Sequence, residues 1–235
     1  MQTRPRHAVH ALFALLFAAA VLVAGCSSSS ESSKALPDAA TLLKDSSETT
    51  RNLQSVHLQL TVAGQIPELP LESLSGDLTN TPVVAAQGKA NILFLGQRLE
   101  GVDFVVADGI LYGAISAGSY QDFGPAADIY DVSAILNPDT GLANVLANFS
   151  DAKADGRETV GDVETVRVTG RVSADAVNKI APQIGATGPV PGTAWIREDG
   201  SHDLVQAKLE PSPGNNVTMT MSEWGKPVTV TKPVV

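Results

Sequence analysis

The chain has 235 residues and a formal net charge of −9, and 43% of its residues are hydrophobic while only 5% are aromatic. This length suits one domain with a substantial core, and the acidity argues against nucleic acid as a partner and against adsorption to anionic membranes by charge. A core of aliphatic residues with few rings is compatible either with close packing or with an unfilled space, and composition does not decide between them.

The first 25 residues are typical of a lipoprotein signal peptide. Arg4 and Arg6 form a basic start without an acid, and residues 11–23 are an almost unbroken apolar run. A run of about 13 residues is too short to span roughly 30 Å of hydrocarbon and has the length of a signal-peptide core. Val23-Ala24-Gly25-Cys26 follows and resembles a bacterial lipobox. Because Cys26 is the only cysteine and stands where a lipobox needs it, we expect its acylation.

Acylation at Cys26 predicts a mature protein that is anchored on the outer, periplasmic face of the plasma membrane without spanning it. Two or more acyl chains anchor stably, at about 0.8 kcal/mol per buried methylene. The Ser-rich tract that follows has too little apolar surface to fold. We therefore expect a signal peptide at 1–25, an acylated cysteine with a flexible tether at 26–35, and one domain at 36–235. The sequence leaves open a fraction in the cell wall or released.

The signal segment carries two of the 16 basic residues and none of the 25 acidic ones, so the mature chain has a net charge near −11. Attachment to the membrane must then come from the acyl anchor. Without Cys26 the domain has no cysteine, which excludes disulfides and thiolate metal sites within it.

The domain begins with a helix and continues with strands. Pro37 and Asp38 give a start signal for a helix predicted over 38–54. Alternating apolar residues at 56–62 then predict a strand with one buried face. An irregular strand at 71–78 and an apolar segment at 91–95 follow. Alternation at 102–106, the turn dipeptide Asp108-Gly109 and a return strand at 110–115 predict a hairpin.

The second half repeats this mixture. Apolar residues at 142, 145, 146 and 149 predict a short amphipathic helix, and a second short helix is expected over Ser173 to Ala181. Strands are predicted at 164–172, 193–197, 204–209 and 217–221. The expected fold class is α+β, with a meandering antiparallel sheet of seven or more strands and helices grouped on one side.

Residues for catalysis are scarce. Only His57 and His202 remain after signal cleavage, and both are expected to be solvated. The chain has no G-x-S-x-G turn, no metal-ligand spacing and no phosphate-binding glycine pattern. Asp151 and the Asp155-Gly156 pair lack the alternation of a calcium loop and are interpreted as a helix end and a turn. We therefore expect a protein that is not an enzyme and has no cofactor.

Several long segments carry a resemblance to a known family. Asp122-Phe-Gly-Pro-Ala-Ala-Asp-Ile-Tyr-Asp131 and Leu136-Asn-Pro-Asp-Thr-Gly-Leu-Ala-Asn-Val-Leu-Ala-Asn-Phe149 resemble the central signature of the mycobacterial LppX/LprAFG lipoproteins. The segments 74–78, 103–106 and 108–112 agree with it. The resemblance extends from the lipobox to about Trp224.

The resemblance implies a half-barrel, in which a strongly curved antiparallel sheet wraps on helices around an apolar cavity. It further implies a carrier of triacylated glycolipids, namely phosphatidylinositol mannosides, lipomannan and lipoarabinomannan, and of triacylglycerol. The resemblance also implies that the protein transports these lipids towards the outer envelope together with a major-facilitator efflux pump. The family has no catalytic motif to transfer.

The strand patterns combined with this resemblance predict the cavity wall. The expected wall residues are Val56, Leu58, Leu60, Val62, Ile92, Phe94, Val102, Phe104, Val106, Leu142, Val145, Leu146, Phe149, Met219 and Met221. A slip of one residue at 91–95 would instead turn Leu93 and Leu95 inward. For Met219 and Met221, which share one strand face, core packing is the more ordinary interpretation, and an adaptable wall for a lipid chain is the functional one.

Two other functions stay open. A structural or adhesive surface lipoprotein would have the same anchor and no cargo. An envelope hydrolase of lipid esters would need a nucleophile and base that the sequence does not display.

Overall fold

The computed structural model describes residues 35–67, 69–116 and 118–235, of which Leu36–Val235 form one compact unit. The signal peptide, the acylation at Cys26 and the tether lie outside the described residues except for Ala35, so these predictions stay predictions.

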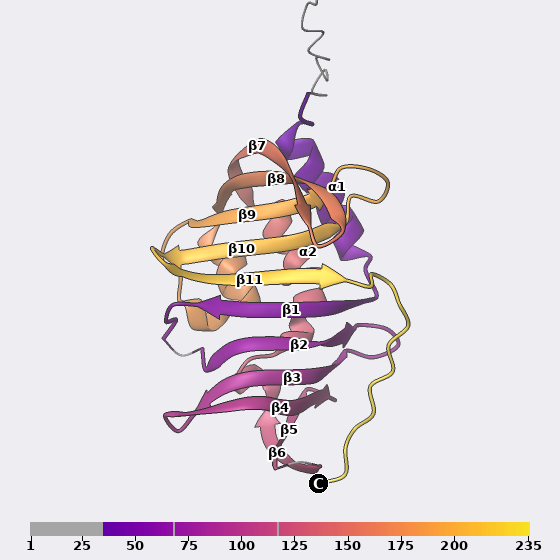
Figure 1. The fold of residues 1–235 in the computed structure, drawn as a ribbon, viewed down its shortest axis with the longest axis vertical. Helices are drawn as coiled ribbons and strands as arrows, with labels where there is room; N and C mark the ends of the chain where they lie inside the picture. Colours follow the sequence, from indigo (N-terminus) through magenta and orange to yellow (C-terminus); the bar gives the residue numbers. More distant parts are fainter. Residues whose placement is uncertain (1–34, 68, 117) are drawn as a thin grey trace, which may run out of the picture. The chain divides into compact units, whose positions relative to one another are not determined.

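Eleven antiparallel strands form one open, curved sheet in the described part of the chain, in the order β6-β5-β4-β3-β2-β1-β11-β10-β9-β8-β7 (Figure 1). The first six strands and the last five are each a meander, and the pairing of β1 with β11 joins them at the centre. The strands are β1 (Ser55–Ala63), β2 (Leu71–Thr79), β3 (Ala85–Phe94), β4 (Gln97–Ala107), β5 (Ile110–Ser116), β6 (Ser119–Pro125), β7 (Phe149–Val160), β8 (Val163–Val172), β9 (Val190–Arg197), β10 (Leu204–Ser212) and β11 (Asn215–Ser222).

Helices lie against the sheet, and their cover is uneven along it (Figure 1). The α-helices are α1 (Ala39–Arg51), α2 (Leu142–Ala147) and α3 (Ala174–Ile180), and the 3₁₀ turns are η1 (Ala126–Asp128), η2 (Val132–Leu136) and η3 (Pro182–Ile184). Helix α1 packs on α2 and on β7 and β9. The helical segment that packs closely on β2 and β3 is the short η2. The half of the sheet that contains β2 and β3 therefore has the thinner cover.

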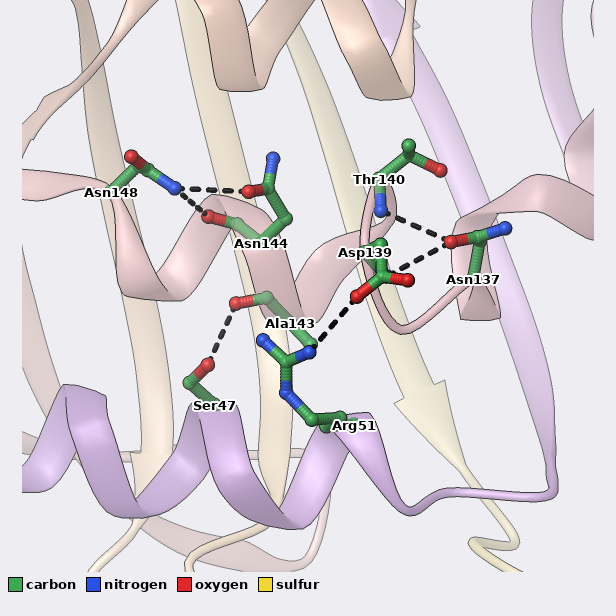
Figure 2. A network of polar contacts seen from close by, with 8 residues as sticks. All are labelled: Ser47, Arg51, Asn137, Asp139, Thr140, Ala143, Asn144 and Asn148. Atoms are coloured by element: carbon green, nitrogen blue, oxygen red, sulfur yellow. Dashed lines mark hydrogen bonds and ion pairs between the residues drawn. The ribbon is translucent and has the colours of Figure 1, made fainter.

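Polar contacts fix α1 against α2 and the loop before it (Figure 2). The carboxylate of Asp38 caps α1 by accepting from the N–H of Thr41 at 2.8 Å. Ser47 Oγ, which is buried, donates to the carbonyl of Ala143 at 2.7 Å, and Arg51 pairs with Asp139 at 3.2 Å. The Ser47 bond gives a partner to a buried hydroxyl that close helix packing would otherwise leave without one, whereas the Asp38 and Arg51 contacts are exposed.

The main core lies between the inner face of the sheet and the helices. A small second cluster of Val105, Ala107 and Tyr112 lies on the outer face of β4 and β5, where Val230 of the C-terminal segment packs against it. After β11 this segment runs past the strand ends towards β5 and β6 (Figure 1). In the described residues, no helix is long and apolar enough to cross a membrane.

The predicted antiparallel α+β fold is confirmed. Two local interpretations are wrong. Asp151 and Asp155-Gly156 are not a helix end and a turn but parts of the 12-residue edge strand β7, and Phe149 begins that strand instead of completing the helical stripe. An edge strand of alternating charged and small residues has no apolar alternation to reveal it, because it needs polar side chains to limit pairing with other chains.

Candidate functional site

A cavity of about 140 Å³ lies under the thinly covered half of the sheet. Its walls come from the inner faces of β2 to β6, from Pro70 before β2 and from the segment at 129–132. The lining residues are Pro70, Leu71, Leu74, Ala90, Ile92, Leu93, Phe94, Val102, Phe104, Leu111, Gly113, Ile115, Phe123, Ile129, Tyr130 and Val132.

The cavity has a physical origin in the elements around it. Short 3₁₀ turns cannot present the continuous apolar stripe with which an α-helix fills the space over a sheet. Small residues add to the gap, because Ala90 and Gly113 stand on the inner face where larger side chains would fill it. The ring of Phe123 packs directly over Gly113. A Cβ at position 113 would lie only 2.9 Å from Phe123 Cε2, which is too close for a larger residue without a shift of the ring.

Four of the predicted wall residues line this cavity, namely Ile92, Phe94, Val102 and Phe104. Val62 lies instead at a second, wider hollow. The others belong to the main core or pack against it, and they are Val56, Leu58, Leu60, Val106, Leu142, Val145, Leu146, Phe149, Met219 and Met221. They face the interior of the domain, but they pack into the core and do not line the cavity.

At the end of β3, the structure has the inward residues of the expected register, Ile92 and Phe94, and one residue of the slipped register, Leu93. A bulge between Ala90 and Ile92 shifts the pairing with β4. Ile92 and Phe94 then line the cavity, but Leu93 contributes to it as well, and Leu95 is 89% exposed. The bulge and the strand end together allow three consecutive residues to reach the same space.

Tyr130 carries the only polar side-chain atom among the lining residues. Burial, with a smaller contribution from the neighbouring Asp131, raises the pKa of its phenol above the ordinary value of 10.0. The hydroxyl is therefore neutral at physiological pH, and the cavity wall carries no charge.

The mouth of the cavity is apolar on its outer side too. Leu93, Phe94 and Ile115 line the cavity and are also partly exposed to solvent. Exposed apolar side chains that continue into an apolar cavity are typical of binding surfaces.

The second hollow, of about 970 Å³, opens beside the first and shares Pro70, Leu71 and Leu93 with it. It lies at the β1–β2 connection and includes the polar residues Gln65, Glu72 and Arg98. Arg98 Nε lies 2.6 Å from Glu72 Oε2. An apolar cavity and a hollow of mixed apolar and polar lining therefore meet at the same end of the strands.

A serine, a histidine and an aspartate meet on the outer face of β1 and β2. His57 Nδ1 lies 2.7 Å from Asp77 Oδ1, and His57 Nε2 lies 3.2 Å from Ser75 Oγ. The order of contacts is that of a hydrolase triad. Ser75, however, sits inside the ladder with strand neighbours on both sides, at Gln59 and Lys89, and not on an exposed nucleophile turn with free N–H groups for an oxyanion.

A metal site requires several ligand side chains in one place. Within the residues that the structure describes, no three His, Asp or Glu side chains are grouped to hold an ion.

Twelve of the sixteen lining residues were not among the predicted wall residues. Leu71 and Leu74 lie on a strand that was expected, but they are three residues apart, so a period of two would turn only one of them inward. A register shift between Leu71 and Ser73 lets both line the cavity. Phe123, Ile129, Tyr130 and Val132 lie in β6 and the irregular segment after it, where no periodic pattern exists. For Phe123, Ile129 and Tyr130 the only signal was the family-like segment Asp122 to Asp131, and Val132 follows that segment directly.

The LppX_LprAFG lipoprotein family model matches residues 38–230. The Lipoarabinomannan carrier protein LprG of Mycolicibacterium smegmatis is 65% identical over 235 residues, which is 99% of each chain. The protein of the same name from Mycobacterium tuberculosis H37Rv is 53% identical over 237 residues, which is 100% of each chain.

Solved structures agree in fold. LprF from Mycobacterium bovis aligns with a TM-score of 0.76 and 33% identity, covering 85% of this chain and 99% of its own. The Mycobacterium tuberculosis lipoprotein LppX aligns with a TM-score of 0.65 and 25% identity, covering 82% and 97%. From the family match, the identity over the full length and the shared curved sheet, we conclude that the chain belongs to the LppX/LprAFG lipoprotein family.

Proposed function

We propose that this protein is an envelope lipid carrier that shelters acyl chains of a glycolipid in the cavity under β2 to β6. The observation that carries the proposal is the wall itself, which is apolar in every lining side chain except Tyr130. Neither a catalytic role nor a metal is needed for this function, in keeping with the outer-face position of the Ser75, His57 and Asp77 contacts.

The physical reason for a carrier is the cost of moving an acyl chain through water. Each exposed methylene costs about 0.8 kcal/mol, so a lipid with several chains leaves a bilayer slowly unless a protein covers them. An uncharged apolar wall supplies that cover, and the adjoining hollow, whose lining includes Gln65, Glu72 and Arg98, leaves room for a sugar headgroup in water.

The size of the cavity sets a further condition. About 140 Å³ is below the roughly 300–1,000 Å³ of typical ligand pockets, so it accommodates only part of one acyl chain. Binding of a triacylated lipid therefore requires the cover to move away from the sheet. The segment with η1 and η2 is the natural moving part, because short 3₁₀ turns have weaker hydrogen-bond geometry than an α-helix.

We propose as cargo the triacylated glycolipids phosphatidylinositol mannoside, lipomannan and lipoarabinomannan, together with triacylglycerol. Support comes from the name of the relatives, lipoarabinomannan carrier protein. The proposal includes acylation of Cys26, an anchored position on the outer face of the plasma membrane, and cooperation with a major-facilitator efflux pump in moving cargo to the outer envelope.

Native mass spectrometry tests the proposal. The Cys26→Ala protein should be produced in a mycobacterial host and, as a control, in a host that lacks these glycolipids. We expect additional masses of triacylated glycolipid only on protein from the first host. A protein that carries the bare polypeptide mass from both hosts would contradict the carrier and favour a structural lipoprotein without cargo.

A further inference from the structure

The turn between β3 and β4 contains an unusual residue. Phe94 pairs with Gln97, so Leu95 and Gly96 alone make the turn, and their φ angles are +50° and +77°. Two central residues with positive φ define the hairpin turn that prefers Asn-Gly or Asp-Gly, because an ordinary side chain is strained there.

The next hairpin of the same sheet shows the usual solution. Ala107 pairs with Ile110 around Asp108 and Gly109, whose φ angles are +55° and +75°. The two turns have the same geometry, but the β3–β4 turn carries leucine where the β4–β5 turn carries aspartate. Leucine at this position adds backbone strain and also exposes 89% of its surface to solvent. Neither feature helps folding, and together they point to a binding role.

Leu95 continues an apolar surface that reaches the cavity. Leu93 is 48% exposed and Phe94 39% exposed, and both also line the cavity. We call Leu93, Phe94 and Leu95 the apolar tip. A hydrocarbon chain that touched this tip would be in contact with the cavity wall without crossing water.

The apolar tip is also uncharged in an acidic protein. No charged residue occurs from Ala90 to Gln97, although the chain has a net charge of −9. The nearest charge, Arg98, is paired with Glu72 at 2.6 Å. Uncharged and apolar chemistry fits the interior of a bilayer.

We propose that the apolar tip inserts into the outer leaflet of the plasma membrane and directs the cavity mouth at the hydrocarbon. Nine residues lie between Cys26 and Leu36, so ten steps along the chain join them and reach at most about 35 Å when fully extended. An anchor at Cys26 would therefore hold the domain within reach of the leaflet that the tip enters. The benefit to cargo loading rests on the proposed carrier function, but the insertion itself does not.

The test uses a substitution that relieves strain while it removes the apolar surface. In the Cys26→Ala background, Leu95→Asn places the residue that this turn prefers at the most exposed point of the tip. Val83→Asn is the matched control, because Val83 is also apolar and 62% exposed but lies before the start of β3, at the opposite end of the strand. Thermal unfolding and co-sedimentation with phosphatidylcholine vesicles are measured for all three proteins.

We expect the melting temperature of Leu95→Asn to equal or exceed that of its parent, while its vesicle affinity falls roughly tenfold, the effect of withdrawing one leucine from hydrocarbon. Val83→Asn should bind vesicles like the parent. A second variant, Leu95→Asp, should bind still more weakly because it also adds a charge.

Equal vesicle binding by the parent and Leu95→Asn, or no binding by the parent, would overturn the insertion. Light scattering that shows a parent dimer and a Leu95→Asn monomer would do so too, by assigning the tip to a second copy of the chain. Native mass spectrometry keeps the two proposals apart. Vesicle binding without bound glycolipid would leave insertion standing and remove the carrier, and glycolipid without vesicle binding would do the reverse.

Discussion

Phe94 of β3 and Phe123 of β6 pack edge to face, with ring centroids 6.3 Å apart and an interplanar angle of 86°. Two strands lie between β3 and β6, so in a flat sheet the two strands would be about 14 Å apart. The contact is therefore possible because the sheet curves and both rings point into the concave side, where they line the cavity.

Removal of one ring should loosen the contact between β3 and β6 across the cavity. For Phe123→Ala we expect the release of a bound fluorescent fatty acid to become several-fold faster. The free energy of unfolding should fall by at least about 1 kcal/mol, because an edge-to-face pair contributes about 0.5–1.5 kcal/mol beyond its buried area. Stopped-flow dilution and denaturant unfolding measure the two effects.

Tyr120→Ala is the control for Phe123→Ala, because Tyr120 lies on the same strand but packs against the outer-face cluster. It should lower stability without changing release. An equal acceleration in both variants would mean that the aromatic pair does not control the mouth.

Enlarging a wall residue distinguishes the cavity from the core. Val102 lines the cavity, so Val102→Trp should fill empty space, lower the melting temperature little and strongly reduce glycolipid binding. Val106 lies on the same face of the same strand, is fully buried and does not line the cavity. Overpacking typically costs about 1–3 kcal/mol, so Val106→Trp should destabilise the domain by at least that amount.

Thermal unfolding and lipid binding of both tryptophan variants give the comparison. If Val102→Trp unfolded the domain as readily as Val106→Trp, the space under β4 would behave as ordinary core.

The anchor is tested separately from the domain. Cys26→Ala should abolish stable retention in the membrane fraction and leave the domain folded, because Cys26 lies outside the compact unit that begins at Leu36. Fractionation and circular dichroism report the two properties. Retention of the processed variant through repeated salt and dilution washes would reveal another stable anchor, since an apolar tip alone gives only reversible binding.

The N-cap of α1 gives a dependence on pH. Hydrogen bonds from the backbone and side chain of Thr41 lower the pKa of Asp38 below its ordinary value of 3.8. A lowered pKa in the folded state means that the ionised cap stabilises the protein above pH 3.8 and that this contribution is lost as the pH falls through the folded pKa.

Asp38→Ala should therefore lower the melting temperature at neutral pH, and the difference from the parent should shrink as the pH falls below 3.8. Asn also caps helices but does not titrate, so Asp38→Asn should lose less stability at neutral pH. A difference between the parent and Asp38→Ala that stays constant from neutral to acid pH would exclude an ionised cap.

The Ser75, His57 and Asp77 contacts predict no hydrolysis. The purified domain should not hydrolyse a p-nitrophenyl acyl ester above the rate of buffer, because Ser75 has no oxyanion site. Ser75→Ala should have the same rate as the parent. Turnover by the parent that Ser75→Ala abolishes would establish an esterase on the outer face of the sheet.

Some elements of the fold could be predicted from the sequence and others could not. Strands with one apolar face, such as β1 and β4, follow from alternation because burial imposes a period of two. The Asp108-Gly109 turn follows from its own backbone preference. Strands β6 and β7 at the two edges were missed, because an edge strand in water needs few apolar residues.

The cavity residues, too, could be predicted from the sequence only in part. Alternation predicted that Val56, Val102 and Val106 all point inward, and they do, but only Val102 lines the cavity. An inward direction is a property of one strand and is encoded locally. Whether the space opposite is filled depends on which helical segment crosses that part of the sheet, and this is decided by chain topology.

The sequence by itself determined the lipobox pattern, the antiparallel class of the sheet and the family resemblance, because short-range spacing and long contiguous similarity encode them. Only the tertiary structure decided that β1 joins the two meanders, that α1 and α2 fill the space over one half of the sheet, and that the short η2 leaves a cavity over the other half. The contact of Phe94 with Phe123 was also decided by the tertiary structure, since curvature brings together residues that are separated by two strands and 29 positions in the chain.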